Sequence, residues 1–491
     1  MKKTFLFILL SLNNILAFSQ NITAKIEDRN SKSPIAFATI KTGEFSGVIS
    51  NEEGYFTILE KPKQNDSITI SCLGYETKIV RIQDITSMGF VILLEESVNK
   101  LNTVYLSNKK PNADDIISKV RQHLDENYET KLYTYRIFSR ETAYINFEKL
   151  DFKIEKASHV KKNNLVLVNK SLDSLSTAII NSKTIHFKDF KGNLLRGDST
   201  KTKLTVDKAT ELIDQKNNLS IDDVQHKTQN IILKYLDTTL TYKLKTGLFK
   251  IDDSLSLKES EHSDKQKDED DLNDLKQGTN TLLNRSQFYE NSMLSKILDS
   301  NLYEYTFKNI TFFNDNLIYI INYKPKKSKS KYTGTLYIND ETFAITKVDF
   351  EFADGKRGEK LNLKLLLGVK YVENIRKGSI IYHKNYQNKY QPQYIKFEEG
   401  RYFYVSRPLK FIENSPEKNK TSFDFTIEGN IMTKQELLVT SNTKITIDQF
   451  KKQAEEKTVP FMKLNKYDAS VWGTEQTLEP LQEMKEFKSK Q

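Results

Sequence analysis

Residues 22–94 contain a series of short segments in which apolar and polar residues alternate, each bounded by turn-forming residues. Ile22, Ala24 and Ile26 share one face of the first segment, and further segments follow at intervals of roughly 8–12 residues. The run Asn51-Glu52-Glu53-Gly54 predicts a tight turn in which Gly54 takes a positive φ angle. Short strands at this spacing predict a small β-sandwich.

Four patches of this segment occur in the order and spacing of a known family. They are Pro34–Ile40, Gly47-Val48, Asn51–Phe56 and Ile70–Thr77, and together they resemble the carboxypeptidase-like regulatory domain. The resemblance covers residues 21–97 and implies a transthyretin-like, seven-stranded β-sandwich, a module also found at the N-terminus of TonB-dependent receptors. It implies a non-catalytic accessory domain that acts as an interaction module.

The chain begins with the layout of a secretory signal. Two lysines precede an apolar run from Phe5 to Leu12, and small residues at Ala17 and Ser19 define a cleavage site before Gln20. A buried N-terminal strand or helix is the alternative. We expect residues 1–19 to be a signal peptide. The mature protein is then periplasmic or outer-membrane associated, with no lipoprotein anchor or transmembrane helix, and secretion to the medium is the alternative.

Composition limits the function classes. The net charge of +10 is spread among interspersed acids, and export argues against a nucleic-acid partner. With one cysteine no internal disulfide can form, and Cys72 is interpreted as a small core residue. The densest basic run lies between two predicted strands and reads as a solvated hairpin loop or, alternatively, as a contact for anionic headgroups or polysaccharide at an envelope surface. Its lysines are Lys324, Lys326, Lys327, Lys329 and Lys331.

A zinc carboxypeptidase would need a His-x-x-Glu pair and a further His. The chain contains His123-Leu124-Asp125-Glu126, but this run ends a predicted amphipathic helix capped by Asn112 and carrying Ile116, Ile117 and Val120 on one face. We therefore expect both side chains to face solvent. The sequence offers no candidate catalytic, cofactor-binding or metal-binding residue, and we predict that the protein is not an enzyme.

The middle of the chain is less regular. Helices are predicted at Val206–Ile213 and at 446–457. The stretch Lys258–Thr279 has no apolar period and is interpreted as a solvated loop or a disordered acidic insertion, with calcium binding by Asp268–Asp271 as the alternative.

From Leu302 onward about nine alternating segments predict an antiparallel meander that curves into an open sheet or half-barrel. The patch Gly334–Ile345 resembles a hairpin of the LolA-like half-barrel proteins, in which a curved sheet holds lipid or acyl chains, and the resemblance extends over about residues 300–430. A sheet whose apolar face is closed by the predicted helices is the alternative.

The predicted organisation is mainly β: a signal peptide, the β-sandwich, a linker with one short helix, a large antiparallel domain and a helical tail that packs on the sheet through Tyr467, Trp472 and Leu478. The corresponding ranges are 1–19, 20–97, 98–130, 131–445 and 446–491. The predicted function is a non-enzymatic envelope protein, with the sandwich as interaction module and the curved sheet as scaffold or apolar-ligand (lipid) holder. An outer-membrane protein or lipid is the expected partner. A secreted glycan- or peptide-binding protein and a hydrolase with an unrecognised site are the alternatives.

The cleavage site gives a direct test. Edman sequencing or mass spectrometry of the mature protein should find Gln20 at its N-terminus, because the signal peptidase requires small residues at −3 and −1. Replacing Ala17 with a bulky Arg should leave the precursor uncleaved. A mature protein that retains Met1 would contradict the prediction.

Overall fold

The computed structural model describes residues 22–43, 47–58, 66–97, 111–129, 132–158, 160–182, 184–197, 201–212, 230, 233–247, 249–257, 269–313, 316–473 and 476–488. The predicted signal peptide, residues 98–110 of the predicted linker and the first part of the predicted acidic insertion lie outside these residues. The chain forms two compact units. Unit 1 comprises Met1–Lys109, Ile310–Ile318 and Asp468–Glu483, and unit 2 comprises Lys110–Asn309, Tyr319–Tyr467 and Met484–Gln491.

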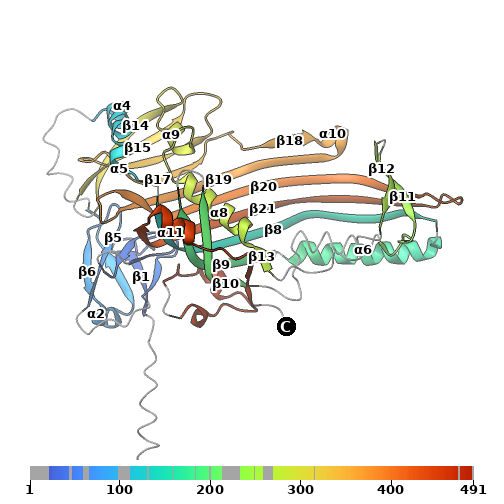
Figure 1. The fold of residues 1–491 in the computed structure, drawn as a ribbon, viewed down its shortest axis with the longest axis horizontal. Helices are drawn as coiled ribbons and strands as arrows, with labels where there is room; N and C mark the ends of the chain where they lie inside the picture. The colour runs from blue at the N-terminus through green and yellow to red at the C-terminus, as the bar shows by residue number, and fades with distance from the viewer. Residues whose placement is uncertain are drawn as a thin grey trace, which may run out of the picture. The chain divides into compact units, whose positions relative to one another are not determined.

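Unit 1 contains the predicted seven-stranded β-sandwich, which is confirmed. One sheet has the order β4-β1-β7 and the other the order β3-β2-β5-β6 (Figure 1). Pairing is antiparallel except between β1 and β7. The strands are β1 (Ile22–Asp28), β2 (Thr39–Lys41), β3 (Gly47–Ile49), β4 (Tyr55–Ile58), β5 (Ser67–Ser71), β6 (Lys78–Arg81) and β7 (Val91–Leu94).

The two sheets enclose one apolar core. Ile26, Phe56 and Ile92 are fully buried there, because alternation along each strand directs every second side chain inward. A short helix that the sequence did not predict, α2 (Ile82–Ser87), joins β6 to β7 and adds the buried Ile85. Cys72 is half-buried and packs against this core.

The predicted turn before β4 is confirmed, and it also fixes a distant segment. Gly54 has a φ of 81°, and a side chain there would collide with the Ile26 carbonyl. The Asn51 side chain accepts from the Tyr55 amide at 2.9 Å and donates to the Pro480 carbonyl at 3.1 Å. Residues 468–483 are thereby held within unit 1.

This placement corrects the prediction for the C-terminal tail. Trp472 and Leu478 are buried, but they lie in the segment assigned to unit 1 and not in unit 2, which contains the large sheet. Only part of the tail joins the sheet: Tyr467 packs with Phe187 and Leu212. The tail is also less helical than predicted. It contains α11 (Ile447–Lys452), β22 (Thr458–Pro460), β23 (Met462–Leu464), a 3-10 turn (Ala469–Trp472) and α12 (Gln482–Lys485).

Most of a 14-stranded open sheet lies in unit 2, in the order β14-β15-β16-β17-β19-β20-β21-β8-β9-β10-β23, with β11, β12 and β18 attached (Figure 1). Strands from β16 to β10 pair antiparallel, and β23 joins β10 in parallel. The bounds are β8 (Tyr133–Ala157), β9 (Thr184–Arg196), β10 (Thr202–Leu212), β11 (Thr241–Thr246), β12 (Phe249–Ser256), β14 (Tyr303–Phe313), β15 (Asn316–Pro325), β16 (Tyr332–Asn339), β17 (Ile345–Phe352), β18 (Lys360–Leu363), β19 (Val369–Lys384), β20 (Tyr390–Glu413) and β21 (Lys420–Lys444).

The three central strands are much longer than the sequence predicted. β8 and β21 have 25 residues each and β20 has 24, which corresponds to about 80 Å at 3.3 Å per residue. Some of the short segments predicted from Leu302 onward are parts of one continuous strand, β20. Irregular positions instead shift the register inside continuous strands, as at Glu428/Gly429.

One face of this sheet is covered by helices. Near the start of β8, Tyr133 and Tyr135 are fully buried in a core that includes residues of α4 (Ala113–Gln122), α8 (Leu272–Arg285) and α9 (Met293–Ile297). Toward the end of β8, Phe147 and Phe152 are buried in a second core with Leu172 and Ile179 of α6 (Lys162–Ser182). Among the described residues, no helix combines the length and the apolar character needed to cross a bilayer.

One helix prediction and one loop prediction in the middle region are wrong. Residues 202–212 form the strand β10, because Leu204 and Leu212 are buried by pairing with β9 and β23 and the bulge at Val206/Lys208 disturbs the period of two. Conversely, the predicted solvated loop ends early: α8 begins at Leu272, with Asp271 as its N-cap.

A buried ion pair ties β8 to β9 on the face opposite to Tyr135. Arg140 and Asp189 form two hydrogen bonds of 2.9 and 2.7 Å, and both side chains are almost completely buried. Burial lowers the pKa of Arg140, but the charge and the hydrogen bonds of Asp189 outweigh this effect and raise it, so the guanidinium stays charged.

Replacing Asp189 with Asn should lower the free energy of unfolding by about 3–5 kcal/mol, because Arg140 would keep a buried charge without a counter-ion. Asp207→Asn is the matched control. Asp207 of β10 forms an ion pair with Arg136, which lies on β8 like Arg140, but the Asp207 side chain is 48% exposed. That change should cost under about 1 kcal/mol. Urea denaturation measures both, and equal losses would contradict the role of the buried pair.

Candidate binding groove on the large sheet

His123 is the C-cap of α4, as the sequence predicted, and Glu126 lies in the short helix α5 (Leu124–Asn127) that follows directly. The His123 side chain is 37% exposed and that of Glu126 75% exposed, with 3.9 Å between Nε2 and Oε2. His123 Nδ1 lies 2.8 Å from the Lys119 carbonyl, and its ring packs on Phe343. Within the described ranges no group of three His, Cys, Asp or Glu side chains is arranged to hold a metal ion.

The acidic run at 268–271, the alternative calcium site, contributes to regular secondary structure. Glu269–Asp271 forms the short strand β13, which pairs antiparallel with β22. The Asp271 side chain accepts from the Asn273 amide at 2.8 Å and so caps α8.

The lysine run lies where β15 connects to β16, as the sequence predicted. Lys324 forms an ion pair with Glu304, while Lys326, Lys327 and Lys329 are exposed in the loop. This loop adjoins the turn that follows β17. The Lys331 carbonyl accepts from the Ala353 amide at 2.9 Å, and the Ser328 carbonyl accepts from Lys356 Nζ at 2.8 Å.

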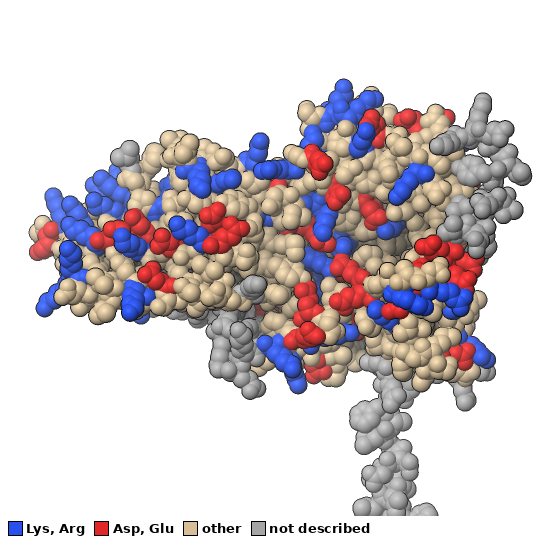
Figure 2. Space-filling model, turned by 180° about the vertical axis from the view of Figure 1, so that it is seen from behind, with Lys and Arg blue, Asp and Glu red and all other residues tan. Residues whose placement is uncertain are grey.

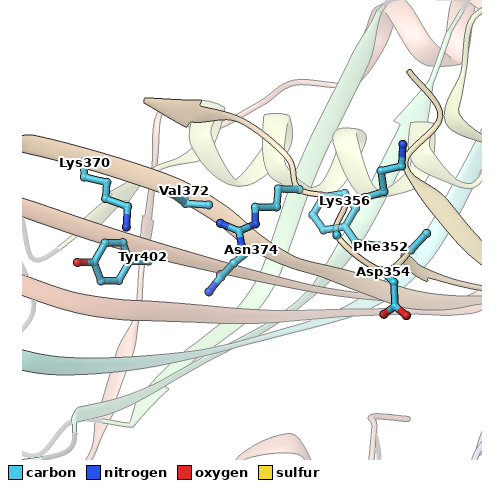
Figure 3. A pocket seen from close by; sticks show the side chains of 10 residues that line it. Phe352, Asp354, Lys356, Lys370, Val372, Asn374 and Tyr402 are labelled. Atoms are coloured by element: carbon cyan, nitrogen blue, oxygen red, sulfur yellow. The ribbon is translucent and has the colours of Figure 1, made fainter. Parts of the chain in front are cut away.

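The same turn borders a groove of about 430 Å³ between the end of β17, β19 and β20 (Figure 3). Phe352 and Tyr402 supply aromatic rings, Lys356 and Lys370 supply cations, and Asp354 is the one acidic side chain of the lining. The remaining lining residues are Ala353, Gly355, Arg357, Val372 and Asn374. Figure 3 shows the Lys370 amine above the Tyr402 ring, at 4.8 Å from its centroid.

Beyond Lys370, the groove continues into a surface segment that we call the flap, Lys360–Lys370. It consists of β18, the single turn α10 (Lys364–Leu367), Gly368 and the start of β19. A second depression of about 370 Å³ is lined by flap residues, and Lys370 belongs to both depressions.

The lysine loop, the turn, the groove and the flap thus form a continuous basic band. It contains Lys326, Lys327, Lys329, Lys331, Lys356, Arg357, Lys360, Lys364 and Lys370. Elsewhere the charges are mixed: on the face shown in Figure 2, Lys and Arg stand beside Asp and Glu over much of the surface. A band with so few carboxylates is suited to bind an extended anion.

A buried carboxylate supports the groove from below. Glu373 on β19 accepts from the Glu359 amide at 3.0 Å and forms an ion pair with Arg376, which also lies 3.2 Å from Glu399. Burial lowers the pKa of Arg376, but Tyr332 and the two glutamates outweigh this effect, so the net shift is upward. Glu373 and Glu399 are therefore engaged in structural pairs with Arg376.

Tyr402 is a neutral donor at physiological pH. Partial burial, together with its 2.5 Å hydrogen bond to Glu428, raises the pKa of Tyr402 to about 12. No sequence motif marks Lys370, Tyr402 or Phe352 as functional residues. Only the pairing of β19 with β20 brings these strands together, through Val372 opposite Tyr402, and no local motif encodes that register.

The buried side chain of Glu373 requires a glycine at position 358. A side chain at Gly358 would overlap the Glu373 carboxylate, which is buried and cannot swing away without breaking its contacts. Gly358→Ala should therefore lower the free energy of unfolding by about 1–3 kcal/mol.

Gly278→Ala in α8 is the control, because nothing lies within 4 Å of its added Cβ. It should leave the protein as stable or stabilise it by up to about 1 kcal/mol. Thermal denaturation compares the two variants, and a neutral Gly358→Ala would contradict the support role of Glu373.

Comparison with known families bears on the N-terminal part of the chain. Residues 22–106 match the family model described as a CarboxypepD_reg-like domain, which confirms the resemblance found in the sequence. The match covers under a fifth of the 491 residues. A comparison with curated proteins gives no match.

Among solved structures, the chain is similar to a Bacteroides fragilis protein of unknown function that is provisionally described as membrane-associated. The two share 7% identity with a TM-score of 0.12, over 85% of this chain and 98% of the other. Similarity at this level carries no argument about function, and the LolA-like resemblance of Gly334–Ile345 stays a prediction. The comparisons therefore identify residues 22–106 as similar to CarboxypepD_reg-like domains, and the rest of the chain is interpreted from its own structure.

Proposed function

We propose that this protein is a non-enzymatic, exported component of the cell envelope. In this proposal the β-sandwich of unit 1 binds a partner protein, and the large sheet of unit 2 is a scaffold that presents the basic band to an anionic envelope surface. The family match of residues 22–106 is the observation that carries the proposal, because modules of this kind are accessory and not catalytic.

The sandwich offers a recognisable contact element. β6 is the last strand of the order β3-β2-β5-β6, so it is an edge strand of its sheet. Its Ile79 is 70% exposed, while the neighbouring Val80 is buried. An edge strand with an outward apolar side chain suits the addition of a partner strand, in which main-chain hydrogen bonds give affinity and side chains give specificity.

The scaffold role is supported by the packing of the sheet. The apolar face that could have held a lipid is filled by the chain's own side chains, including the fully buried Tyr133, Tyr135 and Leu283. This packing favours the scaffold over the apolar-ligand holder. The exposed pair His123–Glu126 gives no support to the hydrolase alternative.

The basic band supports contact with an anionic surface. Lipid phosphates and acidic polysaccharides share the chemistry that its amines recognise, so the band alone does not distinguish them. Lys and Arg are mixed with Asp and Glu over the face shown in Figure 2, which supports a contact confined to the band.

Cell fractionation tests the proposal. The wild-type protein should be found in envelope fractions, and Ile79→Asp should shift it toward the soluble periplasmic fraction, because a charge at the edge strand opposes strand addition. Ile447→Asp is the control, since Ile447 is also exposed, at 56%, but lies at the start of α11. Wild-type protein in the culture medium would reject the envelope location. Equal distributions of the two variants would reject the edge strand as the contact element.

A further inference from the structure

The flap carries a group of leucine side chains that are exposed to solvent. Leu365 is completely exposed, Leu366 is 73% exposed and Leu361 is 46% exposed. The sequence from Lys360 to Lys370 contains five leucines and three lysines but no acidic residue. Single exposed leucines are common on protein surfaces, whereas a group of them usually marks an interaction site.

The leucines are held in this exposed position by a defined backbone. β18 pairs with β19 from Lys360 opposite Val372 to Leu363 opposite Val369. Gly368 ends α10 with a φ of 63°, and its carbonyl accepts from the Ser406 amide at 2.8 Å. Arg407 Nε donates to the Leu367 carbonyl at 2.6 Å. The flap is thus fixed to β20, and the exposure of its leucines follows from its fold.

A second pair of exposed apolar side chains lies next along the same edge of β20. The hairpin of β11 and β12 attaches there, with Lys245 opposite Lys410, and it carries Phe249 at 53% and Ile251 at 56% exposure. Arg407 connects the two elements, since its Nη1 lies 3.5 Å from Thr246 Oγ1 of the hairpin. The flap and the hairpin therefore form one apolar tip region at this edge.

The charges around the tip region indicate which kind of surface it binds. Lys364 and Lys370 hold their amines over the rings of Tyr404 and Tyr402, at 3.8 and 4.8 Å, and neither forms an ion pair with a carboxylate of the described residues. On the hairpin, Lys243 and Lys250 both form ion pairs with Asp253, and Asp252 is the second acidic residue of β12. Protein–protein interfaces are depleted of lysine at their centres, whereas leucine flanked by lysine is typical of segments that lie at the surface of an anionic bilayer.

We propose that the flap docks on an anionic lipid bilayer, with Leu361, Leu365 and Leu366 entering the headgroup region and the lysines contacting lipid phosphates. An acidic polysaccharide would pair with the lysines of the flap but would leave its leucines exposed to water. The inference rests on the proposed function in one respect, that the protein works at an envelope surface. It adds the lipid as the source of the anionic groups and the flap as the anchor.

Co-sedimentation of the purified full-length mature protein with vesicles tests this inference. The wild-type protein should bind vesicles of equal parts phosphatidylglycerol and phosphatidylcholine and should bind pure phosphatidylcholine weakly. Raising the salt from about 0.1 M to about 1 M should reduce binding, because the phosphate contacts are screened. The double variant L365S/L366S should reduce the partition coefficient about tenfold or more, since two apolar side chains no longer enter the bilayer.

The control is V166S/L167S on α6, which removes two apolar side chains that are each 66% exposed. It should bind vesicles like the wild type. Equal losses in both double variants, or a wild-type protein that stays in the supernatant, would overturn the inference. A protein that binds a soluble acidic polysaccharide but no vesicles would overturn the bilayer as the target and leave the proposed envelope function intact.

Discussion

The antiparallel pairing of β20, β21 and β8 is the constraint on which the rest of unit 2 depends. Residues Thr421–Lys444 of β21 pair with Tyr133–Ala157 of β8, and the opposite edge of β21 pairs with β20 over most of its length. Because side chains alternate between faces, a slip of one residue would move the whole apolar set to the wrong side. The helices α4, α6, α8 and α9 can cover one face only because this register holds over the full strands.

Elements that depend on local alternation or on a capping residue could be predicted from the sequence. The seven strands of the sandwich, the turn at Gly54 and the helix capped by Asn112 all follow from patterns shorter than about 15 residues. Residues 202–212 are ambiguous in sequence, because Val206 and Leu212 fit a helix as well as a strand. Pairing with β9 and β23 makes them a strand. The groove could not be predicted, because Lys370 and Tyr402 become neighbours only through a register set elsewhere.

Charged residues of unit 2 have two different roles. Arg140 and Arg376 are buried or half-buried and have carboxylate partners, so their charges are used to hold strands together. The lysines of the basic band lie over aromatic rings or in loops, where only a few acids accompany them. The same residue types thus serve the fold where they are paired, and remain available to an external anion where they are not.

The distance in sequence between β8 and β21 also fixes an order of events during folding. Their paired residues are more than 260 positions apart, so β8 has no partner on that edge until nearly the whole chain has been synthesised. Unit 1 is also completed late, because it includes residues 468–483 near the C-terminus. Unit 2 therefore cannot assemble its central strands around a nascent N-terminal fragment, whereas the core of the β-sandwich consists of residues between Ala24 and Leu94 alone. The large sheet is thus the last major element of the chain to form, because β21, which joins β8 to β20, is among the last strands to be made.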